Sequence, residues 1–205
     1  MQQTSLDRRT LAKGAAWAAP ALTLAAGAPM LAGSTPPPCP TCLSVTGGIF
    51  TAQAVTVLCL SNVTGTAAFN IDASACPLGL FNPTYALLGL GGSVTWSDGT
   101  SNNLVSASAG VGTFGAVSLF NSTFTMFGVN MPNASPFGAY PKKPTKLCYN
   151  FNAIFTALLV VPTDVSCNYT VCFDVTTTST GTVALGTGTV NWTGLTTNPV
   201  LTYNP

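Results

Sequence analysis

The chemistry that this chain could perform is limited by the side chains that it lacks. It contains no histidine and no glutamate, and beyond residue 34 it contains no arginine. General acid–base catalysis at neutral pH most often uses histidine, followed by carboxylates and lysine. A Ser-His-Asp triad and a Cys-His pair are therefore both excluded within the chain.

The carboxylates that remain after residue 34 are four aspartates: Asp72, Asp98, Asp164 and Asp174. Two carboxylates could serve a glycosidase if they faced each other across a sugar. These four are scattered along the chain, and no local motif surrounds any of them. We therefore expect the aspartates to lie in turns and at strand edges, and we expect no catalytic residue. A small hydrolase that uses aspartates is kept as the second alternative to the function given at the end of this section.

The N-terminus has the order of a secretory signal, which is basic, then apolar, then small. A short basic stretch, 7–13, precedes an Ala- and Gly-rich apolar run, 14–32, and the small residues Ala-Gly-Ser follow at 32–34. Arg8 and Arg9, followed by Thr-Leu-Ala-Lys, resemble a bacterial twin-arginine export signal. The Ala-rich composition is similar to such signals from high-GC Gram-positive bacteria.

The resemblance implies a protein that is secreted or held at the cell surface. We expect residues 1–34 to be a cleaved signal, 35–42 a proline-rich leader and 43–205 a single all-β domain. The alternative is a signal that stays uncleaved as a membrane anchor, which would be the only membrane contact. No cofactor is expected.

The cysteines after residue 34 are candidates for disulfides, because exported proteins fold under oxidising conditions. There are seven of them: Cys39, Cys42, Cys59, Cys76, Cys148, Cys167 and Cys172. They allow at most three bridges, and their connectivity does not follow from the sequence. Cys167 and Cys172 lie five residues apart in a predicted strand, so their side chains point to opposite faces, about 16 Å apart. Each therefore needs a different partner.

Cys39-Pro-Thr-Cys42 has the spacing of a thiol-exchange motif. It follows a proline run instead of lying in a βαβ unit, so a structural bridge is the better interpretation. A second alternative follows from the export route, since twin-arginine substrates fold in a reducing cytosol before export. An all-cysteine metal site could then form, but no second Cys-x-x-Cys exists, and we expect no metal.

Short apolar and β-branched runs, separated by Gly, Asn, Asp and Ser, predict an all-β fold. The clearest strand lies within 165–178, where Tyr169, Val171 and Phe173 point to one face. Asp98-Gly99 marks a hairpin turn. About ten short strands predict a β-sandwich or a barrel, and of the two we expect the antiparallel β-sandwich. Thr- and Gly-rich runs with Val-Thr-Trp at 94–96 resemble bacterial surface Ig-like domains, which implies the same architecture.

The surface of the domain must be made of neutral polar residues. Three lysines against four aspartates give a net charge of −1 after residue 34, whereas typical domains are about 25% charged. This composition contains no basic footprint for nucleic acid. Because few charges are present to repel other copies, the domain is also poorly protected against self-association.

The longest segment without a strand pattern is 132–146. It carries all the lysines of the domain together with two aromatic residues, namely Phe137, Tyr140, Lys142, Lys143 and Lys146. Long loops of this kind are often functional. The candidate contact is an anionic or sugar-rich cell-wall polymer, and the alternative is a loop whose lysines only provide solubility.

These patterns predict a non-catalytic structural or adhesive module at the cell surface or outside it, whose ligand no motif identifies. Its partners would be a cell-wall polymer or further copies of itself. The first alternative is a soluble carbohydrate-binding module, which should present Trp96, Trp192 or Tyr140 on one exposed face.

Overall fold

The computed structural model describes residues 39–76, 81–131, 142–157, 163–184 and 186–204. The predicted signal, with Arg8 and Arg9, lies outside these residues. The part of the chain that is described is all-β, as predicted. It contains no helix of the length and hydrophobicity that a membrane crossing requires.

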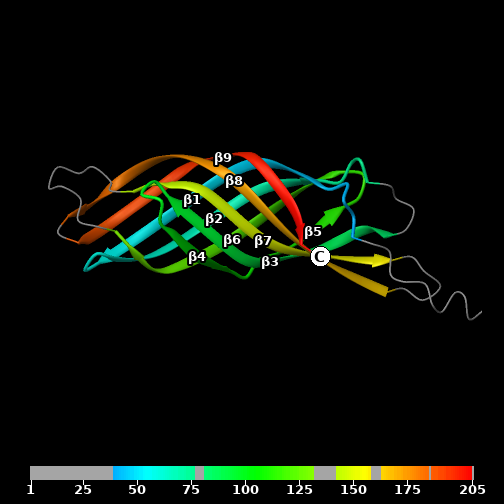
Figure 1. The fold of residues 1–205 in the computed structure, drawn as a ribbon, viewed down its shortest axis with the longest axis horizontal. Coiled ribbons are helices and arrows are strands. Elements are labelled where there is room, and N and C mark those ends of the chain that lie inside the picture. Colours follow the sequence, from blue (N-terminus) through cyan, green and yellow to red (C-terminus); the bar gives the residue numbers. More distant parts are fainter. Residues whose placement is uncertain (1–38, 77–80, 132–141, 158–162, 185, 205) are drawn as a thin grey trace, which may run out of the picture. The chain divides into compact units, whose positions relative to one another are not determined.

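The described strands are longer than the sequence predicted. They are β1 (Ser44–Val57), β2 (Leu60–Asp72), β3 (Phe81–Trp96), β4 (Ser101–Ser106), β5 (Ala109–Thr113), β6 (Val117–Asn130), β7 (Pro144–Ala157), β8 (Thr163–Ala184) and β9 (Thr187–Asn204). Figure 1 shows them in sequence order from blue to red. The hairpin predicted at Asp98-Gly99 is confirmed, because β3 and β4 pair across this turn.

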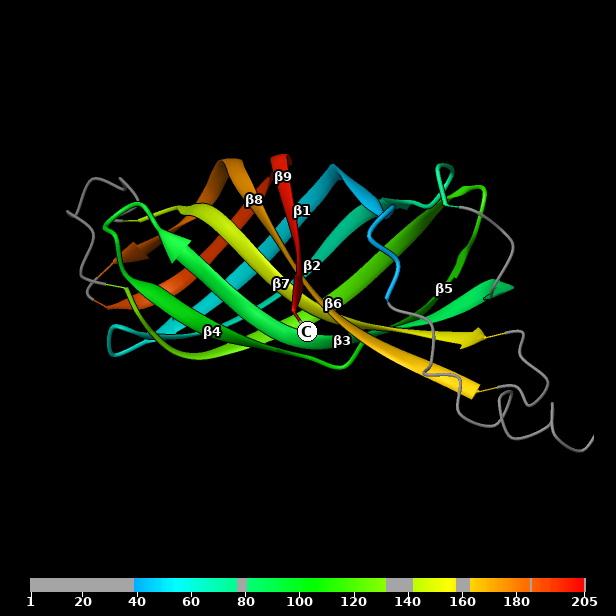
Figure 2. The same ribbon diagram turned by 45° about the vertical axis from the view of Figure 1, so that its right-hand side comes forward.

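The sheet closes into an antiparallel barrel of eight strands, with β5 as an additional strand. The order is β4-β6-β2-β1-β9-β8-β7-β3, and β3 pairs again with β4. One edge of β3 serves two neighbours in succession, since 84–88 pair with β5 and 92–95 pair with β4. Figure 2 shows β4 and β5 near different ends of β3.

The predicted open β-sandwich of the Ig-like type is therefore wrong. Alternation of apolar and polar residues is the same in a sandwich and in a barrel, so periodicity does not distinguish them. The difference lies in the pairing of β3 with β4, together with that of β4 with β6. These two pairings join what would be free edges of an open sheet.

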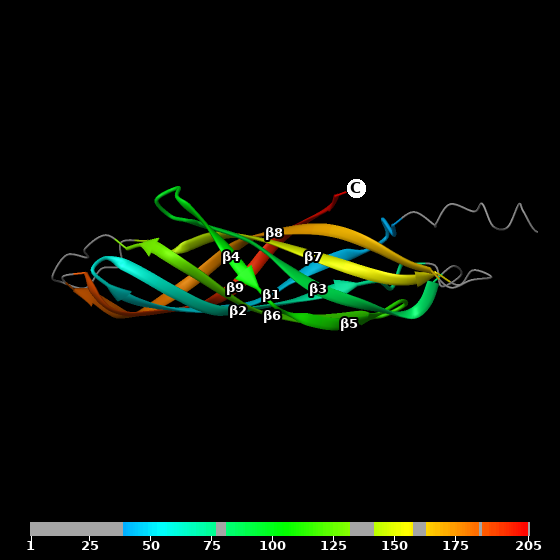
Figure 3. The same ribbon diagram turned by 90° about the horizontal axis from the view of Figure 1, so that it is seen from below.

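The inner faces of opposite strands meet in an aromatic core. Figure 3 shows β7 and β8 on the opposite side of the barrel from β2 and β6. Phe69 of β2 lies with its ring centroid 5.4 Å from that of Phe173 on β8 and 5.9 Å from that of Tyr149 on β7. The prediction that Tyr169 and Phe173 share a face is confirmed, because both are buried. The core therefore holds the two sides of the barrel together.

Three disulfides are present: Cys39–Cys167, Cys42–Cys76 and Cys148–Cys172. The prediction that Cys167 and Cys172 have different partners is confirmed. Cys167 is buried on the inner face, whereas Cys172 lies directly opposite Cys148 on the neighbouring strand. Three disulfides indicate an oxidising, extracytoplasmic environment.

Two of these bridges attach residues 39–42, the described part of the predicted leader, to the barrel. Cys39 and Cys42 each bond to a cysteine far along the chain, so the structural interpretation of their motif is confirmed. The Tyr169 hydroxyl donates a hydrogen bond of 2.8 Å to the Pro40 carbonyl in the same segment. Cys59 lies in the turn between β1 and β2, where its backbone N–H donates to the Gly186 carbonyl.

Candidate functional site

Lys142 of the predicted contact loop is buried, not exposed. Its side chain is 3% exposed, and its Nζ lies 3.5 Å from the Asp98 carboxylate and 3.2 Å from the Thr100 hydroxyl. The ammonium also lies 5.2 Å from the centroid of the Trp96 ring, within cation–π range. Hydrogen bonds from Thr100 lower the pKa of Asp98, and the charge of Lys142 adds to this effect. Lys142 therefore secures the β3–β4 turn, which corrects its assignment to a contact surface.

The other loop candidates have different positions. Lys143 is exposed, and its backbone N–H donates to the Ser97 hydroxyl. Lys146 is exposed on β7, opposite Asp174 of β8, so it belongs to a strand and not to the loop. Phe137 and Tyr140 lie outside the described residues. The structure therefore buries Lys142 and leaves Lys143 and Lys146 exposed.

The two tryptophans considered for a sugar platform belong to the core. Trp96 and Trp192 are 2% and 1% exposed, and their ring centroids lie 5.4 Å apart. The Trp96 indole N–H donates a hydrogen bond of 2.8 Å to the Asn102 side chain. Sugar stacking needs an exposed ring face, so neither residue can serve as a platform in this conformation.

Asp72 ends β2, Asp98 lies in the β3–β4 turn, and Asp164 and Asp174 lie ten residues apart on β8. Each accepts a hydrogen bond from a neighbouring group. Asp72 accepts from the Ser74 backbone, Asp98 from Thr100, Asp164 from Thr156 and Asp174 from Asn198. Hydrogen bonds from Ser74 lower the pKa of Asp72. Within the described ranges, no three His, Cys, Asp or Glu side chains are placed to hold one metal ion.

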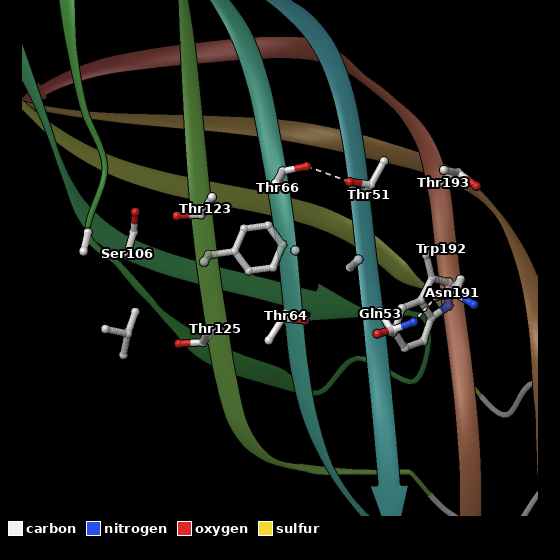
Figure 4. A pocket seen from close by; sticks show the side chains of 15 residues that line it. Thr51, Gln53, Thr64, Thr66, Ser106, Thr123, Thr125, Asn191, Trp192 and Thr193 are labelled. Carbon is white, nitrogen blue, oxygen red and sulfur yellow. Dashed lines mark hydrogen bonds between the residues drawn. The ribbon is translucent and has the colours of Figure 1, made fainter.

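A shallow groove on the outside of the barrel was not predicted. It has a volume of about 590 Å³ and crosses β9, β1, β2, β6 and the end of β4. Three consecutive residues from each of β9, β1, β2 and β6 line it, with the outer two pointing outward and the middle one inward. The end of β4 adds Val105 and Ser106, together with Ala107 just beyond it. Figure 4 shows these side chains from close by.

Strand register places the outward side chains in two parallel rows. The first row is Thr193, Thr51, Thr66 and Thr123. The second row is Asn191, Gln53, Thr64, Thr125 and Val105. Two pairs of neighbours bond to each other: the Thr51 and Thr66 hydroxyls are 2.6 Å apart, and the Gln53 amide donates to Asn191 at 2.9 Å. Figure 4 marks these contacts with dashed lines.

The backbone between the two rows forms the floor of the groove. Gly65 lies at its centre, and a Cβ there would come within 2.5 Å of the Phe124 ring and of the Thr51 carbonyl oxygen. The Phe124 ring therefore lies where a side chain at position 65 would otherwise be. Alternating threonines at 64–66 and 123–125 are the sequence signal that could have predicted outward hydroxyls, but their alignment across strands depends on the register.

At the end of β4 the groove meets a cluster of hydroxyl groups that extends into the barrel. Ser106 bonds to the Tyr149 hydroxyl at 2.5 Å and to the Ser122 hydroxyl at 2.9 Å. Ser122 also donates to Tyr149, and Ser108 donates to Ser122 at 3.1 Å. The cluster joins β4 and β6 to β7 through the interior.

A second unexpected feature is an apolar tip at the β1–β2 hairpin. Its members are all more than half exposed: Val55, Val57, Leu58, Leu60 and Phe127. Val57 lies opposite Leu60, while Phe127 lies in the irregular stretch of β6 near Val63. Leu58 is 82% exposed and has a φ of 51°. A bulky residue with positive φ is strained, and such strain often accompanies a functional position.

No family model, curated protein or solved structure matches this chain. An aromatic core fills the inside of the barrel, and the outside presents the neutral groove and the apolar tip.

Proposed function

We propose that the protein is a non-catalytic structural or adhesive module that works outside the cytoplasm. Its partners are further copies of itself and a polymer of the cell envelope. The extracytoplasmic setting is supported by the three disulfides. The proposal names no residue with a catalytic role.

The observation that carries the proposal is the apolar tip. An exposed apolar cluster on a soluble domain commonly marks a contact surface. Leu58 holds a strained left-handed conformation at the apex of a two-residue turn, where Asn or Gly would be unstrained. A leucine in this place lowers the stability of the domain and exposes apolar surface to water. Burial of Leu58 against a partner would offset both costs.

The weak charge of the domain favours a second copy as one partner. Lys142 and Asp98 already pair with each other, which leaves two lysines and three aspartates after residue 34. Electrostatic repulsion between copies is therefore small. Two copies related by a two-fold axis would bring the same tip from each into one apolar interface.

Sedimentation velocity over a range of concentrations tests this proposal. We expect the full chain to form concentration-dependent assemblies that Leu58→Asn weakens strongly. Asn tolerates positive φ, so this variant should unfold at the same temperature as the parent or at a higher one. A loss of association therefore cannot be ascribed to misfolding.

The matched control is Val111→Asn on β5, where an apolar side chain that is also more than half exposed lies away from the tip. It should leave association unchanged. A chain that stays monomeric at every concentration, or that Leu58→Asn leaves fully associated, would contradict self-association through the tip.

A further inference from the structure

We infer that the groove across β9, β1, β2 and β6 binds a neutral, hydroxyl-rich chain, namely an uncharged oligosaccharide or polysaccharide. The inference deepens the proposed function by naming the class of polymer that an adhesive module would hold. For its setting outside the cytoplasm it rests on that proposal.

The lining groups match an uncharged polyol. Among the described residues that line the groove, none carries a charge. Threonine and serine hydroxyls both donate and accept hydrogen bonds, and the amides of Gln53 and Asn191 supply two donors and an acceptor each. A sugar hydroxyl also donates and accepts, so it can bond to every one of these groups. A charged polymer would find no counter-charge here.

The two rows give the groove a direction. Side chains two residues apart on one strand are separated by roughly 6.5–7 Å, and neighbouring strands lie about 4.8 Å apart. The rows therefore form two walls with hydroxyl or amide groups at each strand crossing. An extended chain lying across the strands would meet a pair of polar groups at every step, whereas a compact small molecule would use only part of the groove.

Four of the eight polar side chains in the two walls are also held in place before any ligand binds. Thr51 and Thr66 bond to each other, as do Gln53 and Asn191. Fixed side chains lose little rotamer freedom on binding, which favours affinity for a ligand that offers only weak polar contacts.

Titration of the full chain with neutral hexasaccharides tests the inference. The panel contains maltohexaose, cellohexaose, laminarihexaose and mannohexaose, with hexagalacturonate as an anionic comparison and an uncharged Ser/Gly peptide as a non-sugar chain. Binding is followed by calorimetry and by tryptophan fluorescence, since Trp192 lies in the floor of the groove. We expect at least one neutral hexasaccharide to bind at millimolar concentration or below.

The variant Thr64→Val/Thr125→Val removes two hydroxyls from one wall and keeps the side-chain shape. Each lost hydrogen bond is worth about 0.5–1.5 kcal/mol, so affinity should fall roughly tenfold or more. The matched control Thr113→Val removes an exposed hydroxyl on β5, outside the groove, and should leave affinity unchanged. Thermal unfolding of all three proteins verifies that each is folded.

Several results would overturn the inference. These are no binding by any of the four sugars, equal binding by the groove variant, or preference for hexagalacturonate or for the peptide. Sedimentation without sugar separates this outcome from the proposed self-association, because the groove variant keeps the apolar tip. If the protein associates but binds no sugar, only the assignment of the groove is contradicted. If it binds sugar but stays monomeric, only the proposed self-association is contradicted.

Discussion

The inner and outer faces of the same strands differ sharply in composition and in what they do. Phe124 is buried and stacks on Phe50, while its neighbours Thr123 and Thr125 point outward into the groove. The inner face carries the aromatic contacts that join opposite sides of the barrel. The outer face carries neutral hydroxyls along the groove and exposed apolar side chains at other positions. A closed barrel thus separates the residues that determine stability from those that are free to make contacts.

The largest effect that tests this comparison is expected inside the barrel. Phe69 contacts aromatic rings from three other strands, so Phe69→Ala should lower the free energy of unfolding by about 3–5 kcal/mol. Leu119→Ala, at an exposed position on β6, should change it by about 0.5 kcal/mol or less. Urea unfolding measures both variants. Similar losses for the two would break the distinction between the faces.

A pH effect of intermediate size should also come from the inner face. Burial raises the pKa of Tyr85 from 10.0 to about 12, and the charge of Asp72 adds to this. The folded state therefore favours the protonated phenol, and this contribution is complete below pH 10 and is lost as the pH rises toward 12. The limiting slope is about 1.4 kcal/mol per pH unit.

Alkaline unfolding curves of the parent and of Tyr85→Phe measure this contribution. The variant should lose less stability than the parent across that range. Tyr169 also has a raised pKa because it is buried, so part of the alkaline loss should persist in the variant. Parallel curves for the two proteins would contradict the assignment to Tyr85.

The smallest expected effect lies where the two faces meet, at the hydroxyl cluster. Tyr149→Phe removes one member, but Ser106 and Ser122 still bond to each other at 2.9 Å. The free energy of unfolding should therefore fall by about 1 kcal/mol. Tyr203→Phe, at a more exposed ring, is the control and should have no measurable effect. Chemical denaturation of both variants would sharpen the comparison, and a loss as large as that of Phe69→Ala would place the cluster within the stabilising core.

Features that depend on residues close together in the chain could be predicted from the sequence, and features that depend on distant residues could not. The alternation of Tyr169, Val171 and Phe173 was read correctly because side-chain direction in a strand is a local property. The opposite directions of Cys167 and Cys172 followed from the same rule. Lys142 was misplaced because its burial depends on Asp98 and Trp96, which precede it by more than forty residues. The composition of 132–146 suggested a surface loop, and it contained no information about that distant contact.

The groove was missed for a related reason. Gln53 and Asn191 are 138 residues apart in the chain and face each other only because β1 pairs with β9 in one register. A shift of one residue would turn every outward threonine inward. Composition indicated that hydroxyls would cover the surface, but it contained no information on which of them would align.

The amino-acid sequence by itself determined the β class, the two faces of each strand, the separate partners of Cys167 and Cys172, and the lack of histidine and glutamate. These are properties of single residues or of near neighbours. Tertiary structure alone decided that the sheet closes, that Lys142 is buried, and that polar side chains from four strands form two rows. Each of these depends on strand pairing between distant segments, whose register is set by how the whole aromatic core packs.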